Sequence, residues 1–346
     1  MSKASCATRI TKLFNIRAPI VLPGMSWIST PPLVAAVSNA GGLGILATGP
    51  LSAEETKRSI AEIRRLTDKP FGIGATLLMP GASDNVEVAL QEKVPVINFS
   101  LGKGDSIVER AHAYGGKVMA TVVNEKHGRS AVSSGVDALM VTGHEAAAHG
   151  GDVTSLCLIP ALSARLPDTP IVAAGGFANG RGLLAALALG ADGVAMGTRM
   201  ACTSESPLAH ASKLAIVEGR ETDTIYSKNF DGLHARVLRT QNSSKVTRRP
   251  TNPIAAAYLS FGAAQQVGLP LWKVVPGLLT QWDKMYQLAL FGGATKRIMA
   301  ATVDGDLDYG VQFVGQSLGQ VDSIESVADV VDSALEEAAA RHALTA

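Results

Sequence analysis

Short, continuous apolar runs alternate with longer amphipathic stretches along much of the chain. Strands that are buried on both faces produce continuous runs, whereas half-exposed strands alternate apolar and polar residues. The pattern therefore predicts parallel strands separated by helices. The eight predicted strands cover residues 19–22, 43–46, 71–77, 94–99, 117–123, 138–141, 171–174 and 193–196.

Helical patterns lie between nearly all of these strands. The helix predicted over residues 52–66 begins with Ser52 and Glu55, which have the spacing of a capping box. Eight strand–helix units favour an α/β fold of the TIM (β/α)8 barrel type over an open doubly wound sheet. The open sheet remains an alternative, but Pro23-Gly24-Met25-Ser26 follows the first strand in place of a GxGxxG motif.

The pattern changes after Thr198. Residues 217–303 are expected to be helical or irregular, and we interpret them as an inserted small helical lid domain. This region contains Trp272 and Trp282, which we expect to be packing residues. The flanking segments, 1–216 and 304–346, would form the barrel, with an amphipathic helix over 324–340 as its final element.

The composition of the chain favours some classes of protein and partner over others. The chain has 346 residues, 47% of them apolar, and 35 glycines, which suits a large barrel with many tight turns. A net charge of +1 gives no reason to expect nucleic acid or an acidic membrane surface as a partner. The cysteines Cys6, Cys157 and Cys202 form no metal-binding pattern, and the last two are expected to be small buried residues. Since neither a signal peptide nor a membrane span is evident, we expect a cytoplasmic protein.

The two final predicted strands each end in glycine. Gly175 and Gly176 follow the seventh strand, and Gly197 and Thr198 follow the eighth. Glycine lets an anion approach backbone N–H groups closely, and a nearby helix N-terminus adds the positive end of its dipole. TIM barrels frequently bind phosphate after strands seven and eight. The sequence therefore predicts a phosphate site, although two tight turns without a ligand would give the same pattern.

Other candidate side chains fall at the predicted carboxyl ends of strands, where TIM-barrel chemistry is located. They are Gly24, Met25 and Ser26 after the first strand, Gly74 and Thr76 in the third, and Thr142, His144, Glu145, His149 and Asp152 at and after the sixth. A metal site is an alternative for the last group. No metal is expected, because that loop is rich in Ala and Gly and the other strand ends offer few acidic residues. A phosphate site with one strong acid–base candidate suits a phosphorylated cofactor.

Several stretches together resemble the nitronate monooxygenase family, formerly called 2-nitropropane dioxygenases. They are 23–25 (PGM), 39–44 (NAGGLG), 144–151 (HEAAAHGG), 173–180 (AAGGFANG) and 190–199 (GADGVAMGTR). Phe71-Gly72 and Gly315-Gln316 also fit, and the same motifs occur in the related flavin-dependent enoyl-ACP reductases. The resemblance covers about residues 8–340. It implies a TIM barrel that binds FMN non-covalently, with a small helical domain over the flavin.

The resemblance also implies roles for particular residues. Those assigned to FMN are Gly24, Met25, Ser26, Gly74, Thr142, Ala174, Gly175, Gly176, Gly197 and Thr198. Thr142 stands where relatives usually carry Gln, Glu or Asp near the flavin ring. Ala147 and Ala148 replace glycines that are frequent in the family, and His149 matches its catalytic histidine.

The leading hypothesis is an FMN-dependent nitronate monooxygenase that uses O2 and yields a carbonyl product and nitrite. A neutral His149 would take the α-proton of a nitroalkane, and a protonated His149 would hold the oxygens of a nitronate. The main alternative is an NAD(P)H-dependent FMN reductase of an enoyl thioester or a quinone. A non-catalytic FMN-binding barrel and a metal-dependent aldolase-type barrel are further alternatives. The sequence does not determine the oligomeric state, for which a homodimer is one candidate.

Overall fold

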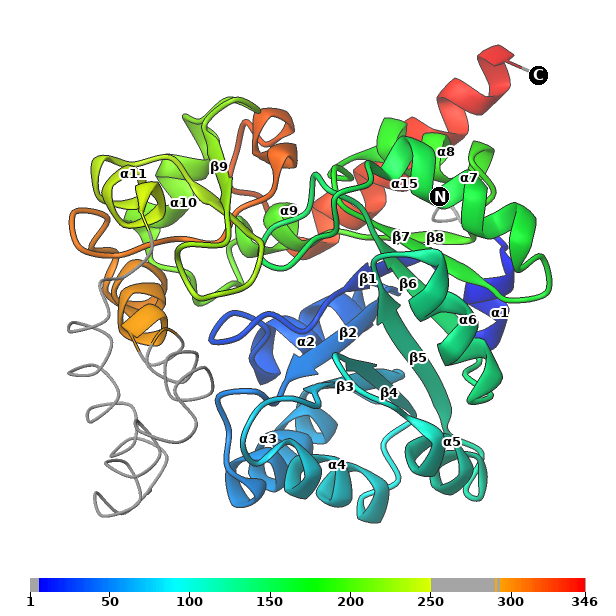
Figure 1. The fold of residues 1–346 in the computed structure, drawn as a ribbon. Helices are drawn as coiled ribbons and strands as arrows, with labels where there is room; N and C mark the ends of the chain where they lie inside the picture. The colour runs from blue at the N-terminus through cyan, green and yellow to red at the C-terminus, as the bar shows by residue number, and fades with distance from the viewer. Residues whose placement is uncertain (1–5, 250–289, 291–292, 346) are drawn as a thin grey trace, which may run out of the picture.

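A closed barrel of eight parallel strands forms the centre of the computed structural model, which describes residues 6–249, 290 and 293–345 (Figure 1). The strands are β1 (Ile20–Leu22), β2 (Leu43–Ala47), β3 (Phe71–Thr76), β4 (Val96–Ser100), β5 (Lys117–Val122), β6 (Ala138–Thr142), β7 (Ile171–Ala174) and β8 (Gly193–Ala195). Val21 of β1 pairs with Leu43 of β2 on one side and with Ala195 of β8 on the other. This closure confirms the predicted TIM barrel and its eight strands.

Helices follow most of the strands and surround the barrel, and further helices lie at its amino-terminal end and beyond β8. They are α1 (Arg9–Phe14), α2 (Pro31–Asn39), α3 (Ala53–Leu66), α4 (Ala82–Gln91), α5 (Asp105–His112), α6 (Glu125–Ser133), α7 (Ser155–Arg165), α8 (Gly180–Ala188), α9 (Gly197–Ala201), α10 (His210–Val217), α11 (Gln241–Arg248) and α15 (Val327–Thr345). The capping box of α3 is confirmed, since Ser52 Oγ accepts from the Glu55 N–H and the Glu55 carboxylate accepts from the Ser52 N–H. The final helix, α15, packs beside α8 (Figure 1). No helix among the described residues is long and apolar enough to cross a membrane.

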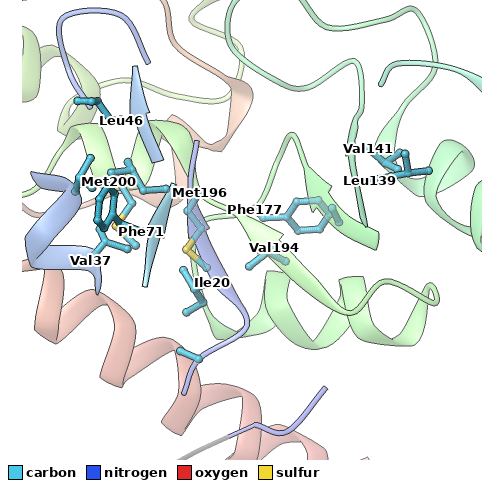
Figure 2. Packing of buried hydrophobic residues seen from close by; sticks show 14 of the residues in the cluster. Ile20, Val37, Leu46, Phe71, Leu139, Val141, Phe177, Val194, Met196 and Met200 are labelled. Atoms are coloured by element: carbon cyan, nitrogen blue, oxygen red, sulfur yellow. The ribbon is translucent and has the colours of Figure 1, made fainter. Parts of the chain in front are cut away.

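Two separate hydrophobic clusters result from the alternation of side chains along each strand. Ile20 and Val194 point outward and pack with helix residues such as Val37 (Figure 2). The second cluster contains the inward-facing strand residues together with Ile10 and Phe14 of α1. Helix α1, which the sequence analysis did not predict, therefore contributes to the barrel interior. Because α1 directly precedes β1, it covers the amino-terminal end of the strands.

The described part of the insertion contains a hairpin that the sequence analysis did not predict. Strands β9 (Thr224–Ser227) and β10 (Ala235–Leu238) pair antiparallel within the region expected to be helical or irregular. Helix α11, the π-helix η1 (Ala300–Asp304) and the 3-10 helix η2 (Gln316–Gln320) follow. Phe230 and Val237 of this region belong to a third small cluster, and Phe313 of the later segment packs against it. The predictions for Trp272 and Trp282 concern residues outside the described ranges.

The cysteines divide between the core and the surface. Cys202 is fully buried, as expected. The prediction for Cys157 was wrong, because this residue is exposed on α7. Leu158, Ile159 and Leu162 form the buried side of that helix, so the side chain of Cys157 points away from the core.

Candidate active site

The ends of β7 and β8 present backbone N–H groups at the carboxyl end of the barrel. Gly175 and Gly176 have φ angles of +98° and +87°, in the left-handed region that residues with a Cβ rarely adopt. Helix α9 begins immediately after β8 at Gly197. Within the described chain, the N–H groups of Gly197 and Thr198 have no hydrogen-bond acceptor. Unpaired donors at two adjacent strand ends are suited to an anionic ligand.

At the ends of β1 and β3, Gly24 and Gly74 form a backbone surface that carries no side chains. A Cβ placed on Gly24 would lie 3.5 Å from the Cα of Gly74, so the two backbones approach each other closely. The turn after β1 is held by Ser29, whose Oγ accepts from the Met25 N–H (3.0 Å) and donates to the Pro23 carbonyl (2.7 Å). A Cβ placed on Gly197 would lie 3.5 Å from the Met25 sulfur. The first and last strand ends therefore form one continuous surface.

The loop after β6 is tied to the end of β7. Thr142 is buried and pairs in register with Ala174. The Glu145 carboxylate accepts from the N–H and the hydroxyl of Ser155 at the start of α7. The Ser155 hydroxyl also lies 2.8 Å from the Gly175 carbonyl oxygen. Glu145 thus caps the start of α7. Among the described residues, no group of three His, Cys, Asp or Glu could hold a metal ion.

His149 lies further along the same loop, next to the hairpin. Its Nε2 lies 2.7 Å from Oδ2 of Asp231, in the turn between β9 and β10. The Asp231 side chain is 2% exposed and that of His149 is 32% exposed. The ring of Phe313 lies edge-on to the imidazole, with 6.0 Å between the ring centroids. A half-buried imidazole paired with a buried carboxylate is a suitable arrangement for proton transfer.

The backbone before His149 is also attached to the hairpin. The N–H of Ala148 donates to the Arg236 carbonyl (3.2 Å), and the N–H of Arg236 donates to the Ala148 carbonyl (3.0 Å). Ala148 has a φ of +51°, in the left-handed region that residues with a Cβ rarely adopt. The chain therefore places a strained residue directly before His149.

Arg236 connects the hairpin to the β6 loop through its side chain. The buried guanidinium donates to the His144 carbonyl (2.9 Å) and to Thr224 Oγ1 (2.9 Å). Burial lowers the pKa of Arg236, while Tyr226 and Glu145 oppose that shift. His144 itself hydrogen-bonds through Nδ1 to the Gly151 carbonyl and packs edge-on against Tyr226. His144 therefore holds the conformation of its own loop.

A late segment, residues 315–320, joins three parts of the site. The N–H of Gly315 donates to Thr198 Oγ1 (3.0 Å), and the N–H of Gln316 donates to the Glu145 carbonyl (2.9 Å). Gln320 reaches the Gly176 carbonyl (3.2 Å). The sequence resemblance singled out Gly315 and Gln316, and the structure places them between the β6 loop and the end of β8.

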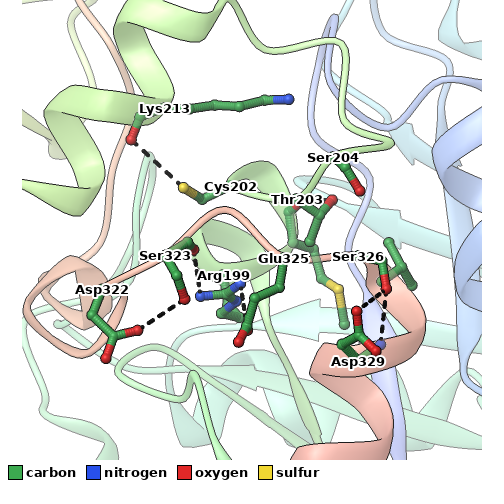
Figure 3. A network of polar contacts seen from close by, with 12 residues as sticks. Arg199, Cys202, Thr203, Ser204, Lys213, Asp322, Ser323, Glu325, Ser326 and Asp329 are labelled. Atoms are coloured by element: carbon green, nitrogen blue, oxygen red, sulfur yellow. Dashed lines mark hydrogen bonds and ion pairs between the residues drawn. The ribbon is translucent and has the colours of Figure 1, made fainter.

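Arg199 attaches α9 to residues 323–325, the segment that precedes α15. Its guanidinium donates to the Ser323 carbonyl (3.0 Å) and to Glu325 Oε2 (3.0 Å), so it ties α9 to the segment before α15 (Figure 3). On the far side of α9, the Cys202 thiol donates to the Lys213 carbonyl. These contacts fix the helix whose first N–H groups face the candidate anion site.

Sequence reasoning missed Asp231. Its position 82 residues after His149 gives no local signal of their pairing. A local signal for the turn was present, since an Asp-Gly pair such as Asp231-Gly232 favours a turn, and the Thr-Ile-Tyr run at 224–226 favours a strand before it. Such a hairpin would have indicated a rigid support within the insertion, but not its partner.

With this geometry established, comparison with known proteins decides the family. A profile of the nitronate monooxygenase family matches residues 7–85 and 75–337. This chain belongs to the nitronate monooxygenase family. It is therefore a member of an oxidoreductase family, as the sequence resemblance predicted.

Two proteins that resemble this chain differ in their described activities. One is the (3aS,4S,5R,7aS)-5-hydroxy-7a-methyl-1-oxo-octahydro-1H-indene-4-carboxyl-CoA dehydrogenase of Mycobacterium tuberculosis, 34% identical over 94% of both chains. Another is a probable nitronate monooxygenase of Staphylococcus saprophyticus, 28% identical over 68% of this chain and 79% of the relative.

Solved structures support the same assignment. FabK from Thermotoga maritima superposes with a TM-score of 0.83 at 34% identity, over 99% of each chain. A nitroalkane oxidase from Streptomyces ansochromogenes superposes with a TM-score of 0.78 at 23% identity, over 97% of this chain and 99% of that one, and supports the fold.

Proposed function

We propose that this member of the nitronate monooxygenase family is an FMN-dependent oxidoreductase that oxidises alkyl nitronates with O2. The observation that carries the proposal is the pairing of His149 with buried Asp231 at the barrel end where β7 and β8 present unpaired N–H groups. One rim of the barrel thus combines an acid–base side chain with donors for an anionic cofactor.

The residues at this rim fit FMN in two respects. The N–H groups of Gly197 and Thr198 are unpaired within the described chain, and a phosphate would accept from them. Gly24 and Gly74 leave a backbone surface against which a flat ring can lie. The further residues proposed to contact FMN are Met25, Ser26, Thr142, Ala174, Gly175 and Gly176. When bound, FMN would accept electrons from the substrate and pass them to O2.

His149 would either remove a proton from the substrate or bind its negative charge. A neutral imidazole can remove the α-proton of a nitroalkane, and an imidazolium can hold the negative oxygens of a nitronate. Asp231 stabilises the positive charge in either case. The insertion, residues 217–303, would form the substrate side of the site and 1–216 with 304–346 the cofactor side. For the described part of the insertion, the proposal rests on the hairpin contacts to His149 and Ala148.

A second candidate function is redox chemistry on an acyl thioester, with NAD(P)H as a candidate electron donor. One observation favours it: the relative matched over 94% of both chains is a dehydrogenase of a carboxyl-CoA compound. The nitronate monooxygenase relative matches only 68% of this chain. The α-carbon of a thioester, like that of a nitroalkane, is acidified by its neighbouring group, so His149 could serve either reaction.

Anaerobic mixing of the FMN-loaded protein separates the two functions. The protein would be mixed separately with propionate 3-nitronate, NADH, NADPH and a saturated acyl-CoA, and flavin absorbance would be followed. Reduction by the nitronate alone is the result expected for the first proposal. Reduction by NAD(P)H or acyl-CoA, without reduction by the nitronate, would favour the second. Purified protein that releases no FMN on denaturation would overturn both.

The same assay tests His149. His149→Ala should retain FMN and lose about 10²- to 10⁴-fold in turnover, the usual contribution of a general acid or base. His112→Ala is the matched control, because His112 also pairs through Nε2 with an aspartate, Asp137 (2.8 Å), but lies at the end of α5, just before β5 and so at the opposite end of the barrel. Unchanged turnover in His149→Ala would mean that this histidine is not catalytic.

A further inference from the structure

We infer that Asp231 is a positioning residue that fixes the tautomer of His149, so that Nδ1 is the nitrogen that exchanges a proton with the substrate. This inference rests on the proposed function and specifies the atoms by which His149 would act. It also assigns a role to the hairpin of the insertion, as the rigid support of the acid–base group.

The hydrogen-bond chemistry determines which ring nitrogen carries the hydrogen. An ionised carboxylate only accepts hydrogen bonds, so the 2.7 Å contact with Asp231 Oδ2 requires a hydrogen on Nε2 of His149. In the neutral ring, Nδ1 then holds a free electron pair. The described part of the chain provides no hydrogen-bond partner for Nδ1. Nδ1 of His149 is also not among the buried polar atoms of the described residues that lack a partner, so it is open to a substrate.

The carboxylate is itself held in place. Oδ1 of Asp231 accepts from the Leu233 N–H (3.1 Å), which leaves Oδ2 for the imidazole. The side chain is almost completely buried, so it cannot turn into solvent without losing both contacts. A buried charge in this position is compensated by these donors and by the positive charge that the ring gains on protonation.

The main chain of the loop is held by the same hairpin. The paired hydrogen bonds between Ala148 and Arg236 fix the backbone directly before His149. Arg236 is anchored in turn to Thr224 of β9 and to the His144 carbonyl. Residues 230–236 therefore hold both the backbone and the ring of His149, and the left-handed conformation of Ala148 sets the direction in which the ring leaves the loop.

His149 would deprotonate a nitroalkane through Nδ1. The α-C–H bond of a nitroalkane breaks, its proton joins Nδ1 of His149, and the electron pair is delocalised onto the nitro oxygens as a nitronate. The ring becomes an imidazolium whose Nε2–H remains on Asp231, and Asp231 stays ionised. A substrate supplied as a nitronate needs no such step. The contribution of Asp231 should consequently be larger for a nitroalkane than for its nitronate.

Asp231→Asn and Asp231→Glu test this difference in the FMN-loaded protein, with nitroethane and ethyl nitronate as substrates. Asp231→Asn should lower kcat with nitroethane about 10- to 1,000-fold, because an amide can also donate to Nε2 and favour the wrong tautomer. With ethyl nitronate the loss should be several-fold at most. Asp231→Glu should recover part of the activity with nitroethane. Equal losses with both substrates would overturn the inference.

Asp192→Asn is the matched structural control. Asp192 is also a buried aspartate held by N–H donors, from Arg9 and Ile171, but it precedes β8 at the opposite end of the barrel. This variant should lower stability without changing the ratio of activities on nitroethane and ethyl nitronate. If it changed that ratio as much as Asp231→Asn, a general loss of stability would explain both variants and the inference would fail.

Nitrogen-15 NMR of histidine-labelled protein provides a readout that does not depend on activity. The His149 signal, assigned by its loss in His149→Ala, should report a hydrogen on Nε2 and none on Nδ1 in the neutral ring. A hydrogen on Nδ1 would overturn the inference. If the protein used neither nitro substrate but showed the expected tautomer that Asp231→Asn removes, the proposed function would fail while the positioning role stood.

Discussion

The backbone N–H of Gly315 donates a hydrogen bond to the hydroxyl oxygen of Thr198 at 3.0 Å, across 117 positions of sequence. This contact brings the late segment of the chain onto the end of β8. It uses the oxygen of Thr198 as an acceptor and leaves the hydroxyl hydrogen available to a phosphate. Gly315 also lies against the β6 loop, so this one residue joins the proposed cofactor site to the loop that carries His149.

Gly315→Ala should disrupt this junction. A Cβ on residue 315 would lie 2.9 Å from the Glu145 carbonyl oxygen and 3.1 Å from the Ala147 nitrogen, both backbone atoms that cannot easily move. We expect a loss of about 1–3 kcal/mol in the free energy of unfolding and reduced FMN content. Gly49→Ala is the control, because its Cβ would make only an ordinary contact with Ser26 Oγ at 3.5 Å. Equal stability and FMN content in the two variants would contradict this prediction.

Ser155→Ala should loosen the β6 loop from β7. The buried hydroxyl lies within hydrogen-bond distance of the Glu145 carboxylate and the Gly175 carbonyl, and its removal leaves these acceptors with fewer donors. The expected loss of unfolding free energy is about 1–3 kcal/mol, measured by urea denaturation. Ser133→Ala, at an exposed serine bonded to the Arg129 carbonyl, should change stability by less than about 0.5 kcal/mol. The prediction fails if the two substitutions have similar effects.

Ala148→Gly should be tolerated better than an ordinary alanine-to-glycine change. Relief of the left-handed strain at Ala148 offsets the extra entropy that glycine has in the unfolded chain, so stability should stay the same or rise by up to about 1 kcal/mol. Ala61→Gly, within the exposed face of α3, should lose about 1 kcal/mol. Thermal or urea denaturation compares them, and a loss in Ala148→Gly as large as that in Ala61→Gly would show that the strain is not relieved.

Glu337 should make the packing of α15 on α8 dependent on pH. Burial raises the pKa of Glu337, but hydrogen bonds and charge from Arg181 and Arg341 outweigh it and hold the pKa below its ordinary value. A lowered pKa means that the ionised group stabilises the fold above about pH 4.3, the usual pKa of an unfolded glutamate. This contribution is lost as the pH falls through the lowered value.

Glu337→Gln should therefore destabilise the protein by up to about 1 kcal/mol at neutral pH, and the difference from the wild type should shrink at an acid pH below about 4.3. Glu336→Gln is the control on the same helix, since Glu336 is exposed. Denaturant titrations at both pH values provide the measurement. A destabilisation of Glu337→Gln that persisted at acid pH would indicate lost packing rather than lost charge.

Much of the barrel and part of the site could be predicted from local sequence. Each strand is a continuous apolar run because both of its faces are buried, and each of the last two ends in glycines where the chain turns into a helix. These are short-range requirements, so they appear as local patterns. The capping box of Ser52 and Glu55 is of the same kind. The hairpin was missed because its short strands resemble other irregular segments, although Asp231-Gly232 marked its turn.

The sequence by itself determined the eight strands, the glycine turns after β7 and β8, and the family motifs that single out His149. Only the tertiary structure decided what holds that histidine. Asp231 reaches His149 from 82 residues away, and Gly315 reaches Thr198 from 117. Such pairs depend on how the insertion and the late segment fold back onto the barrel. The physical reason is that periodicity records which face of an element is buried, whereas the partner of a polar group depends on the three-dimensional path of the whole chain.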